Sequence, residues 1–512
     1  MSGFNLILFK MIIILNKLFL FFLFFFIINN LKEDSKNPTN IPELSLYENQ
    51  TLQIIVPKKE CKYISPITIF FKSEFNDLND SNNYDIKRIN LKDKNYFVTY
   101  YFNGSNGYSV FSSLLEKNGL IRNRKIRRSN NLYFGLIMKI PPANINIQPA
   151  NINIDKGATL NKYQKVEGYE KGKFFFLKDS FYRFYKYMKI IFHEDFNYMP
   201  ESYIYPEDKE IIENKFKNYH LNLDDMWLIK PLNENKGTHT YIFNSLEEIE
   251  SDEFLITRYI QNINLINGRK YDLILYILIS SLNPLRIYLY KKGFVRISIE
   301  KYKFNINSMK KKFKHATDSA PNIENQKFIN EENLNIWNLS KYKIYLEKNK
   351  IKWSDLLLKI KDIIIKSIIS VTGAMYKKNR ELNLKVLNFY KVISVDILIQ
   401  KNFTPILLKM DYFPEIRFYN SIDKKVKTSL FLDALNIIGI APYSRKTRNT
   451  LSINKKSNYL DYNVNNAYCE LKRPRGGFEL IFPINENLKN YSKYFKGNTL
   501  ENKKYWKKIM KE

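Results

Sequence analysis

The pattern of apolar and polar positions changes near residue 156 of the chain. Residues 31–155 are rich in Asn, Lys and Ser, have broken periodicity, and end in a tandem repeat of Pro-Ala-Asn-Ile-Asn-Ile within residues 142–154. Such a duplication is typical of a low-complexity insertion or linker. The sequence therefore predicts a poorly ordered extension over residues 31–155, followed from Lys156 by a packed domain rich in aromatic and aliphatic residues.

Several strands are predicted after residue 270. The apolar or alternating runs Leu273–Ile279, Arg286–Tyr290 and Phe294–Ile299 are separated by Asn283-Pro284 and Lys292-Gly293. This spacing predicts three antiparallel strands joined by turns.

A helix and two further strands are predicted downstream. Trp353–Ser370 places its apolar residues at helical spacing, with Ser354 as a candidate N-cap. Lys391–Gln400 and Thr404–Met410 are strand-like, with Asn402 at the turn between them. Strands and helices that interleave without a regular βαβ period indicate an α+β fold.

An apolar segment near the N-terminus bears on where in the cell the protein is located. Leu18–Ile28 is an unbroken run of Leu, Phe and Ile, preceded by Met11–Leu15 and by Lys10 and Lys17. Residues 1–30 thus resemble a signal peptide or anchor, with membrane association through residues 11–28, although a small-residue cleavage site is missing. A wrongly assigned start and a buried strand are the alternatives.

Composition and charge narrow the class of protein. The chain has 512 residues, 45% of them hydrophobic, which is enough to bury a core in two or three domains. Its net charge of +31 suits a polyanionic partner, but the excess is spread over the whole chain, as coding bias alone would also produce. No nucleic-acid recognition motif accompanies the charge, so we expect no nucleic-acid partner.

Cys61 and Cys469 lie far apart and the four histidines lack ligand spacing, so neither a disulfide framework nor a zinc site is expected.

A lysine at the end of a short apolar run is the first candidate for chemistry. Lys230 precedes a turn-rich segment, and an ammonium beside loop amides suits a phosphate chain. It belongs to an ordered series of motifs: Trp227–Pro231, Ile256–Ile260, Asn267–Leu273, Asn283–Tyr290, Gly293–Arg296, Asp396–Leu398 and Arg475–Glu479. This series resembles the tubulin tyrosine ligase-like family over about residues 156–510, and its end resembles the glutamate-adding branch.

The resemblance implies an ATP-grasp fold in which two α+β lobes close over a nucleotide. Residues 156–226 would form the N-terminal lobe, residues 227–440 the ATP-grasp core, and residues 441–512 a C-terminal extension of the ligase domain. With ATP and Mg²⁺, the γ-phosphate would pass to a carboxylate of a tubulin tail, and the amino group of free glutamate or tyrosine would attack the acyl phosphate. Phosphoryl transfer of this kind depends on positioning and on cations that absorb charge.

The resemblance also implies nucleotide contacts, residue by residue. Lys230 would bind the α- and β-phosphates. The hinge Ile256–Ile260, with Arg258, Tyr259 and Ile260, would read adenine through its backbone. Lys270 and Asp272 would lie at the nucleotide and ribose side.

Four further residues are implied at the reacting end of ATP. Arg296 and Thr317 would lie near the γ-phosphate and the acceptor, and Asp396 would ligate Mg²⁺ together with Asp411, which stands where the family has Asn. Two simpler readings stay open, because Arg296 alternates outward on a strand and Asp396 could be a buried, hydrogen-bonded carboxylate.

Four further positions depart from the family pattern. Lys409 replaces a glutamate that would ligate magnesium, Ile274 replaces an arginine, His239 replaces the second glycine of a loop, and Asp318 replaces an asparagine. An ammonium at position 409 removes a hard oxygen ligand. Either Asp411 and nearby Glu415 compensate, or Lys409 replaces one metal by contacting the phosphates as a point charge.

Three functions are therefore open. The first is an active ligase, with glutamate as the favoured amino acid, which acts on tubulin or microtubules in the cytoplasm. The second is a catalytically impaired pseudo-ligase that binds nucleotide or microtubules. The third is a membrane-tethered relative in the secretory pathway with a non-tubulin acceptor.

Overall fold

The computed structural model describes most of the chain after residue 165 and parts of it before. The described residues are 51–57, 68–73, 84–90, 96–97, 99–102, 109–123, 132–134, 165–169, 171–217, 225–232, 241–243, 245, 253–298, 300–303, 336–381, 388–415, 418, 420–441, 443–444, 459–497 and 500–509. The apolar run Leu18–Ile28 and the tandem repeat lie outside them. Among the helices within these ranges, none combines the length and the apolar character that crossing a membrane requires.

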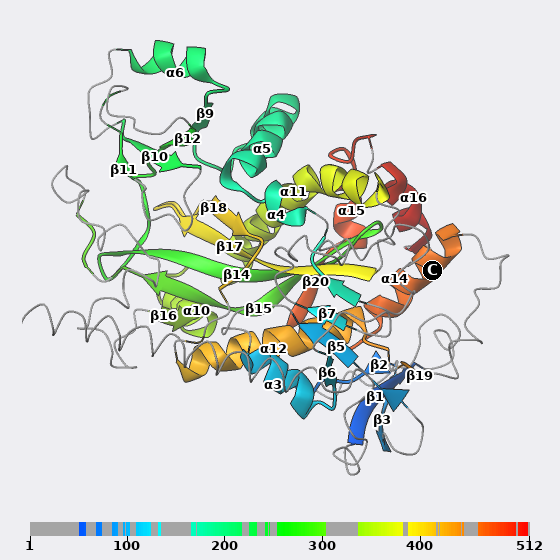
Figure 1. Cartoon of the computed structure of the whole chain (residues 1–512). Coiled ribbons are helices and arrows are strands. Elements are labelled where there is room, and N and C mark those ends of the chain that lie inside the picture. The colour runs from blue at the N-terminus through cyan, green and yellow to red at the C-terminus, as the bar shows by residue number, and fades with distance from the viewer. Residues whose placement is uncertain are drawn as a thin grey trace, which may run out of the picture. The chain divides into compact units, whose positions relative to one another are not determined.

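A large mixed sheet forms the centre of the described chain (Figure 1). Its order is β16-β15-β14-β17-β8-β7-β5-β6, with β13 added to β14, β18 to β17 and β20 to β15. The bounds are β5 Thr99–Phe102, β6 Ile121–Asn123, β7 Leu132–Phe134, β8 Lys165–Glu167, β13 Leu265–Ile266, β14 Arg269–Leu282, β15 Leu285–Ile297, β16 Ile336–Asn338, β17 Phe389–Ile399, β18 Pro405–Asp411 and β20 Phe478–Phe482. This mixture of sheet and helices confirms the predicted α+β class.

Strand β14 is continuously apolar from Leu273 to Ile279 because both of its faces are covered. Its odd-numbered residues from Tyr271 to Ile279 join the main hydrophobic core. Tyr276 and Leu278, on the other face, are equally buried. A strand covered on both sides needs apolar residues at successive positions, which explains the continuous run in the sequence.

The predicted turn at Lys292-Gly293 is wrong. β15 continues through it, so the two expected strands Arg286–Tyr290 and Phe294–Ile299 are one. The register with β14 shifts here, from Gly293 opposite Leu275 to Leu289 opposite Ile277, which marks a β-bulge. Gly293 is required because a Cβ there would lie 2.5 Å from the Ile274 carbonyl oxygen.

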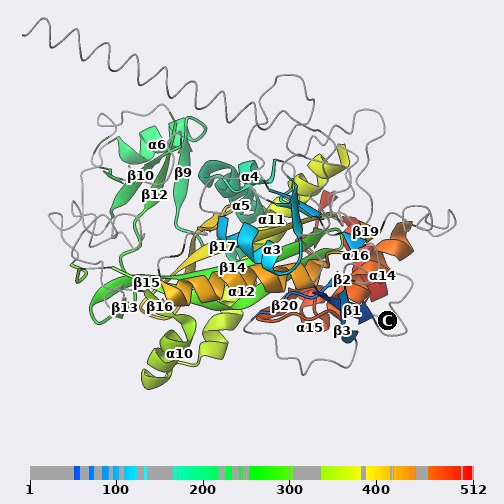
Figure 2. The same ribbon diagram turned by 60° about the horizontal axis from the view of Figure 1, so that its bottom comes forward.

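Two long helices pack against the sheet. α11 (Trp353–Glu381) contacts β14, β18 and β20, and α12 (Ser421–Ile438) contacts β14, β15 and β20. Figures 1 and 2 show the two helices on opposite sides of the β14–β15 layer. The predicted helix at Trp353–Ser370 is confirmed but runs on to Glu381, and Ser354 lies inside it, so the expected N-cap is wrong.

A smaller antiparallel sheet carries the first candidate lysine. Its order is β11-β10-β12-β9, formed by Tyr241–Ile242, Trp227–Pro231, Phe254–Arg258 and Ser202–Tyr205. Helix α6 (Lys209–Phe216) contributes Ile212 and Phe216 to its core, together with Trp227. The other helices that the structure describes after residue 165 are α4 (Gly172–Phe175), α5 (Lys178–Phe192), η4 (His193–Phe196), α10 (Leu339–Lys348), α14 (Tyr459–Leu471), α15 (Asn485–Ser492) and α16 (Leu500–Ile509).

The segment predicted to lack order contains defined elements. β1 (Thr51–Pro57), β2 (Thr68–Ile69) and β3 (Tyr84–Asn90) form one sheet, and β4 (Tyr96–Phe97) pairs with β19 (Tyr443–Ser444). Strands β5, β6 and β7 extend the large sheet, and helix α3 (Ser109–Lys117) lies among them. The backbone N–H of Phe71 donates to Asn436 Oδ1 at 2.8 Å, and Asn436 Nδ2 donates to the Phe71 carbonyl at 2.8 Å. This part of the extension therefore belongs to the folded domain.

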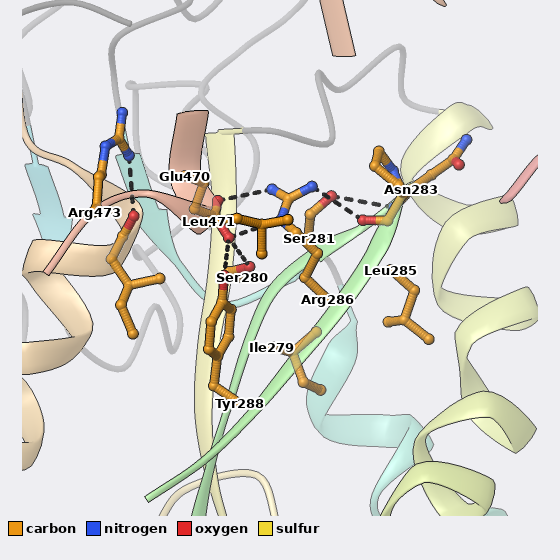
Figure 3. Close-up of polar contacts among 12 residues, drawn as sticks. Ile279, Ser280, Ser281, Asn283, Leu285, Arg286, Tyr288, Glu470, Leu471 and Arg473 are labelled. Carbon is orange, nitrogen blue, oxygen red and sulfur yellow. Dashed lines mark hydrogen bonds and ion pairs between the residues drawn. The ribbon is translucent and has the colours of Figure 1, made fainter. Parts of the chain in front are cut away.

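The C-terminal part is tied to the sheet through a buried ion pair (Figure 3). Arg286 on β15 donates from Nε and Nη2 to the Glu470 carboxylate on α14, at 2.7 and 2.8 Å. Ser280 and Tyr288 also donate to Glu470, at 2.6 and 3.0 Å. Burial favours the protonated carboxyl, but the Arg286 charge and these hydrogen bonds outweigh it and lower the pKa of Glu470.

Cysteine usage differs from the expectation. Cys469, next to Glu470 on α14 and 3% exposed, is disulfide-bonded. No disulfide framework was expected, yet Cys469 takes part in a disulfide. The sequence holds one other cysteine, Cys61, which lies outside the described residues.

Candidate active site

A strip of polar side chains crosses one face of the large sheet on four adjacent strands. The register places Arg296 of β15 opposite Asp272 of β14, and Asp396 of β17 opposite Lys409 of β18. Asp411 follows Lys409 by two positions and therefore shares its face. The odd-numbered residues of β17, from Ile393 to Ile399, face the main core instead.

Four of these side chains form a charged cluster. Arg296 Nη2 lies 2.6 Å from Asp396 Oδ2, and Lys409 Nζ lies 3.4 Å from the same oxygen and 2.9 Å from Asp411 Oδ2. The side chain of Asp396 is 6% exposed and that of Lys409 is 42% exposed. The cluster is therefore anchored in the interior and opens toward solvent at Lys409 and Asp411. Partial removal from water disfavours the charge on Lys409, but the two carboxylates outweigh it and raise its pKa.

A bulge in β18 sets the direction of Lys409. The pairing steps from Asp396 opposite Lys409 to Ile397 opposite Leu407, so Leu408 is an extra residue on β18. With regular pairing, Lys409 would stand opposite Val395, whose side chain belongs to the main core. The bulge thus turns Lys409 onto the face that carries Asp396.

Lys230, at the end of β10, lies near the same cations. Burial, with the charges of Lys178, Lys270 and Lys409, lowers the pKa of Lys230 to about 8. Three lysines close enough to lower the pKa of a fourth favour the binding of a multiply charged anion, because each ammonium is stabilised by opposite charge. Lys230 was predicted to bind phosphate, and Lys270 was predicted to lie at the nucleotide and ribose side.

Lys178 was missed by the sequence reasoning. It is the first residue of α5, where the helix dipole disfavours a cation. A lysine in the first turn of an amphipathic helix is therefore the signal that could have identified it.

The predicted adenine hinge follows β12. Arg258 ends that strand and pairs with Asp225, its Nε lying 3.2 Å from Oδ1. The backbone N–H groups of Arg258 and Tyr259 donate to the carbonyls of Glu201 and Met226, each at 2.8 Å. These two N–H groups are thus used within the protein, and hinge recognition of adenine by Arg258, Tyr259 and Ile260 stays a prediction.

The residues that depart from the family pattern lie in different parts of the structure. Ile274 is buried and stands opposite Asp396 in the register, so an aliphatic side chain lies beside the charged cluster. Thr317 and Asp318, and the loop with His239, lie outside the described residues. Their predicted roles stay predictions.

The cluster does not fit a magnesium ion. Mg²⁺ prefers octahedral oxygen coordination by one or two carboxylates with water and phosphate oxygens. Here the two candidate carboxylates, Asp396 and Asp411, already share the ammonium of Lys409. Within the described ranges, no group of three or more His, Cys, Asp or Glu side chains is arranged to hold a metal.

The sheet with its covering helices and the basic site define an ATP-grasp-like domain of the α+β class. The family model of the tubulin-tyrosine ligase family matches residues 156–450. The chain therefore belongs to the tubulin-tyrosine ligase family.

Curated relatives support this assignment. The chain is 26% identical over 305 residues to "Tubulin polyglutamylase ttll-5" of Caenorhabditis elegans, covering 56% of this chain and 42% of that protein. It is 27% identical over 292 residues to human "Tubulin polyglutamylase TTLL5", covering 55% and 22%. It is 24% identical over 368 residues to mouse "Tubulin polyglutamylase TTLL6", covering 68% and 44%. The match thus spans less than half of each of these relatives.

Proposed function

We propose that this chain is an ATP-dependent amino-acid ligase that adds glutamate to acidic tubulin tails. The observation that supports this most directly is that the charges of three lysines, Lys178, Lys270 and Lys409, act on Lys230. Lys409 and Arg296 both pair with Asp396. Such a set of cations suits the triphosphate of ATP. The names of the relatives, tubulin polyglutamylases, support the amino acid and the acceptor.

The proposed reaction has two steps. A carboxylate oxygen of the acceptor attacks the γ-phosphorus of ATP, the bond to the β–γ bridging oxygen breaks, and ADP leaves. The amino group of glutamate then attacks the acyl carbon, loses a proton and expels inorganic phosphate, which leaves an amide. Lys230 and Lys270 would hold the phosphate chain, and Arg296 would neutralise charge that develops at the transferred group.

The net charge of the chain suits the proposed acceptor. A total of +31 raises the local concentration of acidic peptides by long-range attraction. We accordingly propose tubulin or microtubules as the partner and the cytoplasmic microtubule cytoskeleton as the location.

A second candidate function is a pseudo-ligase that binds nucleotide without turnover. The specific observation in its favour is Lys409, which pairs with the two carboxylates that would otherwise be available to a metal. Buried Ile274 beside them adds no charge that could stabilise an acyl phosphate.

One assay separates the two functions. The full chain is incubated with tubulin, ATP, Mg²⁺ and labelled glutamate, next to Lys230→Met and a matched control, Lys401→Met, on the exposed β17–β18 turn. The ligase predicts incorporation by the unmutated chain and by Lys401→Met, and its loss in Lys230→Met. No incorporation by the unmutated chain, together with retained binding of a fluorescent ATP analogue, would leave the pseudo-ligase.

A further inference from the structure

Lys409 occupies the space between two carboxylates that converge on one face of the sheet. Its ammonium lies 2.9 Å from Asp411 Oδ2 and 3.4 Å from Asp396 Oδ2. We infer that Lys409 is a built-in cation that replaces a divalent metal ion at this position, so that the site holds a phosphate chain without a metal bound to Asp396 and Asp411. The inference rests on the proposed function only in taking that phosphate chain to be a nucleotide triphosphate.

The charge balance of the cluster supports the replacement. Asp396 and Asp411 contribute two negative charges, and Lys409 and Arg296 contribute two positive charges, so the four groups sum to zero. A divalent cation entering this cluster would meet no net attraction from these four groups and would have to displace an ammonium already at contact distance. Its ligands would also be shared, because Asp396 Oδ2 already accepts from Arg296 at 2.6 Å.

The backbone holds Lys409 in this place. The β18 bulge at Leu408 turns the lysine toward Asp396, where regular pairing would send it toward the core. A residue that merely failed to bind a metal would not need this pairing with both carboxylates.

The position of Lys409 also connects the cluster to the other amines. Its side chain is 42% exposed, above a carboxylate that is 6% exposed, so the ammonium lies on the open side of the cluster. It is also close enough to Lys230 for their charges to interact. The ammonium of Lys409 is therefore open to an anion, while Asp396 anchors it from the buried side.

Manganese binding tests the replacement directly. Mn²⁺ takes the same oxygen ligands as Mg²⁺ and is counted by electron paramagnetic resonance. The full chain is titrated with Mn²⁺ in three forms: unmutated, Lys409→Glu, and Lys401→Glu, which makes the same charge change at the far end of the hairpin. The expected result is one additional bound Mn²⁺ in Lys409→Glu alone, with affinity at least about tenfold above that of the other two. This additional ion should disappear when Asp396→Asn is combined with Lys409→Glu.

Two results would overturn the inference. The first is a Mn²⁺ ion on the unmutated chain that Asp396→Asn removes, since the carboxylates would then bind metal despite Lys409. The second is equal Mn²⁺ binding by Lys409→Glu and Lys401→Glu. Far-UV circular dichroism checks folding, and Lys409→Met, which leaves the cluster at one net negative charge, replaces Lys409→Glu if that variant does not fold.

Nucleotide binding provides a second measurement. The affinity of the unmutated chain for a fluorescent ATP analogue is compared in Mg²⁺ and in EDTA, and we expect a change of less than about threefold. A loss of more than about tenfold in EDTA would contradict a built-in cation. If the analogue binds in neither condition, the proposed function fails, whereas the Mn²⁺ titration still decides the role of Lys409.

Discussion

Replacing Glu470 by alanine should destabilise the whole domain. Arg286 is 2% exposed and Glu470 is 5% exposed, and the carboxylate receives two hydrogen bonds from the guanidinium. Glu470→Ala leaves that guanidinium buried without its counter-charge, which costs about 3–5 kcal/mol. Ser280 and Tyr288 lose an acceptor in the same change.

Urea unfolding followed by tryptophan fluorescence measures the effect. Trp506 on α16 is 1% exposed and reports on the C-terminal part of the domain. The matched control is Glu479→Ala on β20, because Glu479 pairs with Lys361 at a more exposed position, 38% and 19% exposed. The control should cost less than about 1 kcal/mol, as surface pairs do.

A double replacement separates the lost charge from lost packing. Arg286→Met combined with Glu470→Leu removes both charges and should recover much of the stability lost in Glu470→Ala. If Glu470→Ala costs no more than Glu479→Ala, the ion pair does not tie α14 to the sheet and this reasoning is refuted.

Three further predictions concern single residues. ATP-analogue affinity should fall as pH rises through about 8, because Lys230 then loses its proton, and it should stay flat in Lys230→Arg in the same fluorescence titration. Gly476→Ala should lower the free energy of unfolding by about 1–3 kcal/mol more than Gly497→Ala does. Both glycines have positive φ, but only a Cβ at Gly476 would meet the Asp433 carboxyl, at 2.1–2.4 Å. Equal losses of unfolding free energy in urea titrations would contradict this. Burial raises the pKa of Asp433 to about 6, so the folded state binds this proton more tightly than the unfolded state does. The resulting stabilisation is complete below pH about 4 and is lost as the pH rises to about 6, a change of about 3 kcal/mol in the free energy of unfolding. Asp433→Asn should abolish this pH dependence in urea titrations across that range.

The fold could be predicted where apolar periodicity was long and regular. The runs within β14, α11, β17 and β18 each correspond to a real element, because burial on one or two faces leaves a clear pattern. The bulge near Gly293 could not be distinguished from a turn, since both favour glycine beside polar residues.

The elements described before residue 156 were not predicted from the sequence. The partners of that segment, such as Asn436 for Phe71, are more than three hundred residues away. Local composition carries no information about such distant contacts.

The candidate site residues stay predictions. Motif order singled out Lys230, Lys270 and Asp396; the charge of Lys270 acts on Lys230, and Asp396 pairs with Arg296. What the sequence left open was the role of Lys409, because contact with both carboxylates depends on a one-residue register shift in β18. Register is a property of paired strands, so it does not appear in either strand's sequence.

The pairing of β20 with β15 has a practical consequence for expression. A fragment that stops at residue 450, where the family match ends, would lack the strand that covers Ile287–Tyr290 of β15. It would expose an apolar edge with unpaired backbone groups, the kind of edge on which chains stack into aggregates. Recombinant work on this domain should therefore retain residues through 509, and insolubility of a shorter piece would say nothing about its chemistry.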